Sequence, residues 1–169
     1  MTANEGEEIL RPAGPNVSEM PTTVPYANDK EEVFFVATKA VILLEDGKML
    51  TLLRGKDAPT NPLGWDLPGG VLEHGEEADH GAMRETKEET GLDIMAPRVF
   101  HAIARANQLG EYWMTIYFFA YAASDAVKIS WEHDEYKWIV PGELDGMQAS
   151  NRIKEAVRVF IQLRDAGKI

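Results

Sequence analysis

The feature that most constrains this chain is a stretch from Glu76 to Thr90 that contains no proline and is rich in acidic side chains. Its only interior glycine is Gly81, acidic residues crowd its beginning, and Gly91 follows directly after it. Acidic residues stabilise the positive end of the helix dipole, and glycine is favoured just beyond a helix C-terminus. The pattern therefore predicts a helix over 76–90.

Three glutamates share one side of this predicted helix. Glu85, Glu88 and Glu89 are spaced i, i+3 and i+4, so they lie within one stripe of the helix surface. Like charges placed in this way repel one another, which costs stability unless a cation neutralises them. Carboxylate oxygens select magnesium, calcium or manganese over zinc or copper. The stripe is therefore a candidate metal site, and a solvated acidic face is the alternative.

The overall charge limits the classes of partner. The sequence has 28 acidic and 17 basic residues, a formal net charge of -11, and no cysteine. This charge disfavours duplex nucleic acid, and a phosphate-handling enzyme of this composition needs a cation between protein and substrate. The missing cysteine excludes disulfides, thiolate zinc sites and cysteine nucleophiles. No apolar run approaches the roughly 18 residues of a membrane span, so we expect a cytoplasmic protein without membrane contact.

Most of the sequence predicts one mixed α/β domain over 33–169. Runs of β-branched and aromatic residues predict strands over 33–45, 48–54, 98–105, 112–123 and 136–140. Residues 58–70 are dense in proline and glycine and predict a loop, and a last amphipathic helix is predicted around Ile153 to Leu163. Strands interrupted by one central and one terminal helix predict a mixed sheet between helices, an α/β/α sandwich.

Residues 1–32 differ from this domain. They carry several prolines among scattered acids and almost no aromatic side chains, so they cannot bury enough surface to fold alone. We predict an extended N-terminal arm. Because such a segment becomes ordered only by packing on another surface, either its own domain or a partner subunit, a homodimer contact through the arm is a hypothesis.

The acidic helix and the loop before it resemble a known motif. The sequence runs Gly70-Val-Leu-Glu-His-Gly-Glu76, then seven residues, then Arg84-Glu85-Thr86-Lys87-Glu88-Glu89-Thr90-Gly91-Leu92. This resembles the Nudix box, Gly-x5-Glu-x7-Arg-Glu-U-x-Glu-Glu-x-Gly-U with U an aliphatic residue, at every fixed position. Thr86 occupies the first aliphatic site. Its methyl group can still pack inward, so this departure concerns helix packing more than the metal face.

The resemblance implies a Nudix hydrolase that cleaves the diphosphate linkage of a small nucleotide substrate with a bound divalent metal, Mg²⁺ or alternatively Mn²⁺. It implies that Glu85, Glu88 and Glu89 are the metal carboxylates, with Glu88 in the catalytic set, and that the backbone carbonyl of Gly70 is a further ligand. Gly69 and Gly70 would allow the backbone to approach metal and phosphate closely.

The resemblance also implies residues that support the metal centre. Arg84, which we also place in the catalytic set, and Glu76 would fix the loop and orient the glutamates. Members of the family often carry a general base on a loop before a tryptophan-containing strand. The segment Trp131 to Trp138 looks like that region, with Glu132 as first candidate and Glu135 as second. The alternative is a polar loop packed by Trp138.

The substrate is less constrained by the sequence than the metal site. Arg54 ends a strand before the box and is a candidate for binding substrate phosphate, with a plain surface arginine as the alternative. Gln108 stands where ADP-ribose-cleaving members tend to carry a proline, which favours nucleoside triphosphates. ADP-ribose and nucleotide sugars stay open, as does a nucleotide sensor that does not cut. A calcium-binding structural protein ranks last because the Asp-rich calcium loop is missing.

Overall fold

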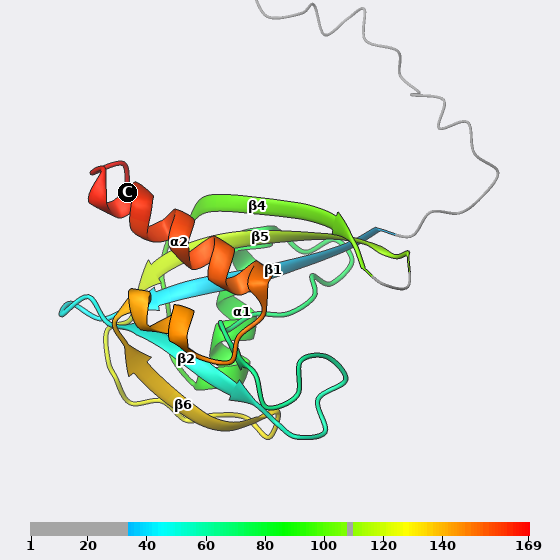
Figure 1. Cartoon of the computed structure of the whole chain (residues 1–169), viewed down its shortest axis with the longest axis horizontal. Coiled ribbons are helices and arrows are strands. Elements are labelled where there is room, and N and C mark those ends of the chain that lie inside the picture. Colours follow the sequence, from blue (N-terminus) through cyan, green and yellow to red (C-terminus); the bar gives the residue numbers. More distant parts are fainter. Residues whose placement is uncertain (1–33, 108–109) are drawn as a thin grey trace, which may run out of the picture. The chain divides into compact units, whose positions relative to one another are not determined.

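The computed structural model describes residues 34–107 and 110–169 (Figure 1), so the predicted arm over 1–32 lies outside the described residues. The strands are β1 (Phe34–Leu43), β2 (Met49–Arg54), β3 (Trp65–Asp66), β4 (Arg98–Ala106), β5 (Tyr112–Tyr121) and β6 (His133–Ile139). The helices are α1 (Ala78–Thr90), the 3-10 helix η2 (Pro141–Gly146) and α2 (Asn151–Asp165). No helix of this described part is long and apolar enough to cross a membrane.

The sheet is mixed, as predicted. Its strand order is β3-β2-β1-β5-β4, and β6 also pairs with β2. β1 and β5 run parallel over their whole lengths, whereas the other strand pairs are antiparallel. β1 meets β2 at the single register pair Leu43 and Met49, so the two strands diverge beyond that point. The loop from Pro68 to Leu72, which leads to α1, pairs with β1 where β2 has diverged from it.

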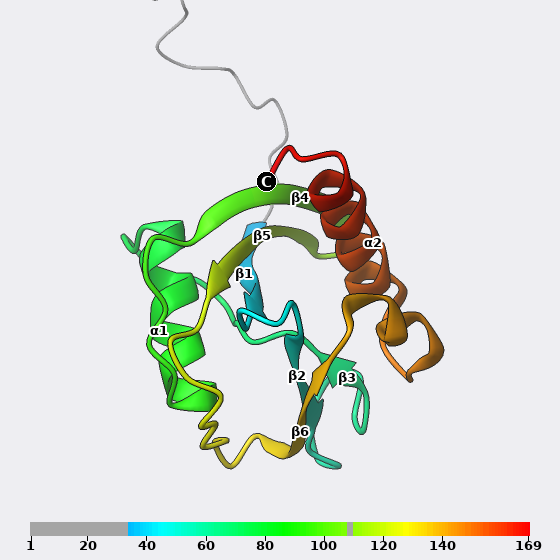
Figure 2. The same cartoon turned by 90° about the vertical axis from the view of Figure 1, so that its left-hand side faces the viewer.

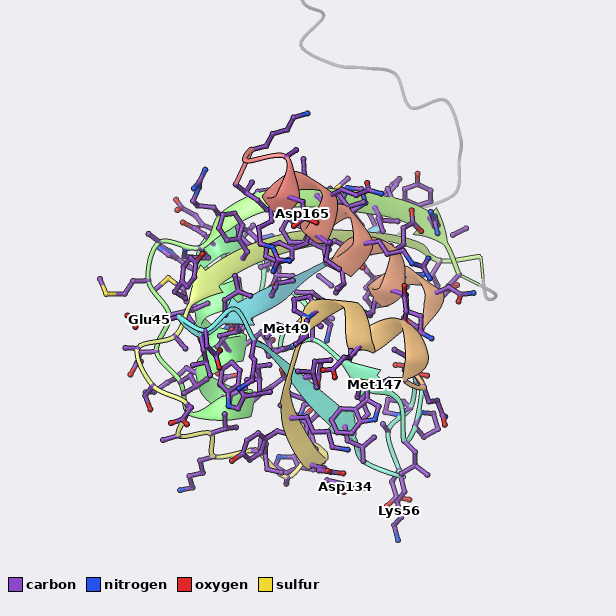
Figure 3. The ribbon with its side chains drawn as sticks, turned by 60° about the vertical axis from the view of Figure 1, so that its left-hand side comes forward. Glu45, Met49, Lys56, Asp134, Met147 and Asp165 are labelled. Carbon is purple, nitrogen blue, oxygen red and sulfur yellow. The ribbon has the colours of Figure 1, made fainter. Side chains whose placement is uncertain are left out.

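The two helices cover opposite faces of the sheet (Figure 2), which confirms the α/β/α sandwich. Because side chains alternate along a strand, Val41 and Leu43 of β1 enter the core beneath α2, while Ala40 and Ile42 enter the core beneath α1. Phe160 is one of the α2 side chains that close the first core, which also includes Met49 (Figure 3). The second core, which includes Ala82 of α1, fixes this helix against the sheet, and with it the glutamate stripe.

Several element boundaries differ from the predictions by one to three residues, and three differences bear on the candidate site. The central helix begins at Ala78, two residues later than predicted, and Glu77 is its N-cap. The region 58–70 is not all loop, because Trp65 and Asp66 pair with β2 as the short strand β3. β6 begins at His133 and not at Tyr136. Pairing with a partner distant in sequence decides the last two boundaries, and no local pattern reports it.

Two positions of α1 show why its sequence suits this place. Thr86 is fully buried and its hydroxyl donates to the Ala82 carbonyl (2.7 Å), so the threonine in the aliphatic position packs inward as predicted. Gly81 lies directly under Leu72, whose methyl group occupies the place that a β-carbon would need. The helix therefore lies close against the loop that precedes it.

Candidate active site

The glycine loop, Pro68 to Leu72, runs antiparallel beside β1. The Ala40 N–H donates to the Pro68 carbonyl (2.9 Å) and the Thr38 N–H donates to the Gly70 carbonyl (2.8 Å). Gly69 has φ +133°, a conformation that side chains rarely adopt, and a β-carbon there would collide with the Thr38 backbone. Glycine is therefore required at this position for the loop to lie against the strand.

The glycine loop is joined directly to the glutamates of α1. The Gly69 N–H donates to Glu89 Oε2 (2.8 Å). A β-carbon at Gly70 would lie 2.5 Å from Glu85 Oε1, so this carboxylate rests on the Gly70 backbone. The two elements that the Nudix-box resemblance connects are thus in contact, and the predicted ligands Gly70, Glu85 and Glu89 are neighbours.

The three glutamates differ in environment. The side chains of Glu85, Glu88 and Glu89 are 16%, 60% and 8% exposed, respectively. Nη1 of Arg84 donates to Glu85 Oε1 (2.9 Å) and Glu88 Oε2 (3.2 Å). Its Nε and Nη2 donate to the two carboxylate oxygens of Glu76 (2.8 and 2.9 Å). Arg84 therefore links two glutamates of the stripe to the loop before the helix.

Glu89 is a carboxylate buried beside both charged and neutral groups. Burial raises the pKa of Glu89 to about 7, although the nearby Lys39 ammonium and the Gly69 N–H favour its charged form. His133 lies 3.8 Å away, Nε2 to Glu89 Oε1, with its side chain 2% exposed. Burial, followed by Lys39 and Arg54, lowers the pKa of His133 to about 4. The imidazole is therefore neutral near pH 7, and this contact is not an ion pair.

The residues fit a hard divalent cation. The carboxylates of Glu85 and Glu89 and the Gly70 carbonyl offer only oxygen atoms, and the Gly70 backbone leaves no room for a side chain among them. In the described residues, one trio of acidic and histidine side chains has ligand atoms within 4.8 Å of one another, namely Glu77, Asp79 and His80. That trio lies at the exposed start of α1, whereas the glutamate stripe is partly buried and lies at the glycine loop. Binding of the ion by the stripe stays a prediction.

The segment before β6 is attached to the end of α1. The Ser130 N–H donates to the Glu89 carbonyl (3.0 Å), and the Gly55 N–H donates to the Glu132 carbonyl (2.9 Å). Figure 3 shows Lys56 and Asp134, which flank these contacts, at the same end of the domain. Glu132 precedes β6 and is exposed, as the prediction requires of a loop residue. Glu135 lies inside the strand, where it pairs with Lys137 (3.3 Å), so its predicted place in a loop is wrong.

The structure places Arg54 at the end of β2 with protein partners. Its Nε donates to the Thr60 carbonyl (2.8 Å) and its Nη1 lies 3.5 Å from Asp66 Oδ2. The side chain is 19% exposed, so Arg54 is not a plain surface arginine. Binding of substrate phosphate by Arg54 stays a prediction.

Three residues near Glu89 were not predicted from the sequence: Lys39, Asp66 and His133. Lys39 Nζ donates to Asp66 Oδ2 (3.1 Å) and to the Leu67 carbonyl (2.8 Å), and both side chains are nearly buried. One sequence signal was available for Asp66, which stands between Trp65 and Leu67 directly before the glycines. A charged residue within an apolar run that leads to a functional loop indicates a buried ion pair.

Comparison with known proteins agrees with this geometry. A family model described as NUDIX domain matches residues 33–161. A putative 8-oxo-dGTP diphosphatase from Bacillus subtilis (strain 168) is 29% identical over 134 residues, which cover 75% of this chain and 86% of the relative. The nucleoside triphosphatase NudI of Escherichia coli is 27% identical over 113 residues, which cover 61% of this chain and 80% of the relative.

Solved structures show the same fold. The MutT protein from Methanosarcina mazei Go1 superimposes with a TM-score of 0.68 at 29% identity, covering 83% of this chain and 99% of that chain. The family match extends over most of the chain, and its helix and glycine loop have the contacts described above. The chain therefore belongs to the Nudix family, and its relatives and structural neighbours are MutT-like.

Proposed function

We propose that the protein is a divalent-metal-dependent hydrolase that cleaves nucleoside triphosphates to the nucleoside monophosphate and pyrophosphate. The observation that carries the proposal is the contact between the glycine loop and α1, which places the Glu85 carboxylate at the Gly70 backbone and the Glu89 carboxylate at the Gly69 N–H. The choice of triphosphates is supported by the names of two relatives, a putative 8-oxo-dGTP diphosphatase and a nucleoside triphosphatase.

The proposed metal ligands are Glu85, Glu88, Glu89 and the Gly70 carbonyl, with Mg²⁺ as the first ion and Mn²⁺ as the alternative. When bound, the divalent ion neutralises the phosphoryl oxygens and makes a water molecule more acidic. Arg84 and Glu76 orient these ligands through their paired hydrogen bonds. Glu88 has the most exposed side chain of the three and is bonded to Arg84, so it would turn toward substrate by giving up that contact.

Glu132 is the proposed general base that accepts a proton from the attacking water. Its position is supported by the backbone hydrogen bonds that tie this segment to α1 and to Gly55. Glu135 is the second candidate, and its ion pair with Lys137 makes it less available for this role. Arg54 lies at the same end of the domain and is the proposed phosphate contact, with Nη2 as the nitrogen that would turn to it.

The test is a panel of nucleoside triphosphates, dinucleotides, ADP-ribose and nucleotide sugars, assayed with Mg²⁺ and with Mn²⁺ for released phosphate or pyrophosphate. We expect triphosphates to give pyrophosphate, and we expect Glu85→Gln to abolish the release. Faster cleavage of ADP-ribose or a nucleotide sugar would transfer the proposal to that substrate. Binding of nucleotides by the folded, metal-loaded protein without cleavage of any of them would make it a sensor.

A homodimer that involves residues 1–32 is a separate proposal, motivated by their low capacity to fold alone. Light scattering of the full chain and of a chain that begins at residue 33 tests it. A dimer that becomes a monomer on removal of these residues supports the proposal, and a monomeric full chain rejects it.

A further inference from the structure

A protein group lies next to each of the two carboxylate oxygens of Glu89. This carboxylate is the most buried of the three glutamates in the α1 stripe, with its side chain 8% exposed. Its Oε2 accepts a hydrogen bond from Gly69, on the glycine loop. Its Oε1 faces the imidazole of His133, on β6. A carboxylate that ligates a metal needs its plane fixed, and hydrogen bonds to its oxygens normally do this.

The place of His133 is set by the backbone on both sides of it. His133 is paired with Arg54 in the sheet, where the register of β2 and β6 shifts. Its N–H donates to the Ser130 carbonyl (3.3 Å), and the Ser130 N–H donates to the Glu89 carbonyl (3.0 Å). The imidazole therefore projects toward α1 from a segment that is itself bonded to α1.

The surroundings of His133 decide which of its nitrogens carries the proton. Nδ1 is buried without a hydrogen-bond partner, and Nε2 lies 3.8 Å from Glu89 Oε1. A proton on Nδ1 would bury an unpaired N–H and set a nitrogen lone pair against a carboxylate oxygen, and both arrangements are costly. A proton on Nε2 avoids both costs and leaves at Nδ1 only a lone pair without a donor. The imidazole therefore directs an N–H toward Glu89 Oε1, 3.8 Å away, which is longer than a hydrogen bond and has to shorten for one to form.

We propose that His133 is a positioning residue for the metal centre: its Nε2–H holds Oε1 of Glu89, as the Gly69 N–H holds Oε2, so that the carboxylate is presented to the divalent ion in one orientation. The proposal rests on the proposed metal site. It adds a residue outside the Nudix box and makes β6 a structural part of the centre. The nearby Lys39 ammonium favours the charged form of Glu89, and the Asp66 carboxylate that pairs with Lys39 opposes it.

The experiment compares substitutions that keep or remove the donor at one place. The amide nitrogen of glutamine reaches the position of histidine Nε2, whereas that of the shorter asparagine reaches only the position of Nδ1, and leucine offers no donor. Mn²⁺ affinity of the full chain is measured by titration calorimetry for wild type, His133→Gln, His133→Asn and His133→Leu, with thermal unfolding recorded for each. His101→Asn is the control, because His101 also has a buried nitrogen without a partner but packs on Tyr117 in the core beneath α2.

We expect His133→Gln to bind Mn²⁺ within about threefold of wild type, and His133→Asn and His133→Leu to bind about tenfold or more weakly, as for other residues that support metal ligands. His101→Asn should leave the affinity unchanged. In turnover assays, kcat should fall in the asparagine variant while KM stays nearly constant. Either the asparagine or the leucine variant, if it folds, is sufficient for the comparison.

If the glutamine variant and a folded asparagine or leucine variant bind Mn²⁺ with equal affinity, the proposal is overturned, and His133 is then a core residue only. The same conclusion follows if both affinities fall together in proportion to lost thermal stability. Failure of wild type to bind Mn²⁺ is a different outcome, because it overturns the proposed metal site as well.

Discussion

The substitution of Gly70 by alanine tests the site with a single methyl group. The added β-carbon would lie 2.5 Å from Oε1, 2.6 Å from Cδ and 2.7 Å from Oε2 of Glu85. Carbon and oxygen atoms in ordinary contact are roughly 3.5 Å apart, so the carboxylate must withdraw by about 1 Å. The atoms displaced belong to the far end of a flexible side chain, so the carboxylate moves and the backbone keeps its place.

The size of the effect follows from this displacement. Misplacing a catalytic group by about 1 Å costs about 10²-fold in rate, or about 2.7 kcal/mol of transition-state stabilisation. We therefore expect Gly70→Ala to lower kcat/KM for a nucleoside triphosphate about 100-fold and to weaken Mn²⁺ binding. The free energy of unfolding should change by about 1 kcal/mol or less, because the three atoms nearest the added carbon all belong to the Glu85 carboxylate.

Two other glycines make the assay specific. Gly142→Ala adds a methyl group with nothing within 4 Å and should behave as wild type in both assays. Gly69→Ala meets the Thr38 backbone at a φ of +133° and should lower the melting temperature, not activity alone. Wild-type kcat/KM and Mn²⁺ affinity in Gly70→Ala would refute the placement of Glu85 at this backbone. A fall in melting temperature equal to that of Gly69→Ala would show that more than the Glu85 side chain moves in Gly70→Ala.

Three further outcomes are expected. Glu132→Gln should lower kcat by about 10² to 10⁴ with little change in KM, while Glu135→Gln keeps most activity; steady-state kinetics check this, and near-normal turnover of the first variant rejects the base. Asp66→Asn should lower the free energy of unfolding by about 3 kcal/mol, since the Lys39 partner stays charged and nearly buried. Urea unfolding measures it, and a loss below about 1 kcal/mol would contradict it. The hydrogen bonds from Arg84 lower the pKa of Glu76 from its ordinary 4.5 to about 2, so this carboxylate stabilises the fold fully above pH 4.5 and progressively less as the pH falls toward 2. The melting-temperature difference between wild type and Glu76→Gln should shrink over that range, and a constant difference would show that ionisation of Glu76 does not contribute.

The sequence predicted the parts of the fold that depend on local pattern. The alternation in β1, with Val41 and Leu43 on one face and Ala40 and Ile42 on the other, is visible as a run of strand-forming residues. The spacing of the glutamates also predicted their common stripe on α1. Both depend only on the period of a strand or a helix, which is the same in every protein.

The parts that were not predicted depend on contacts across the chain. Trp65 and Asp66 form a strand because β2 lies beside them, and proline and glycine on both sides concealed that pairing. His133 stands among acidic residues and looks like part of a polar loop, yet it is buried because β6 starts there and meets α1. Lys39 occupies a strand position of no special pattern, and its role depends on Asp66, which is 27 positions away.

The most direct test of the metal site is an anomalous difference map from a crystal of the full chain soaked in Mn²⁺. The account predicts a peak between the Gly70 carbonyl and the carboxylates of Glu85 and Glu89. A soaked crystal with no peak at these ligands, or with manganese only at the exposed Glu77, Asp79 and His80 trio, would contradict it.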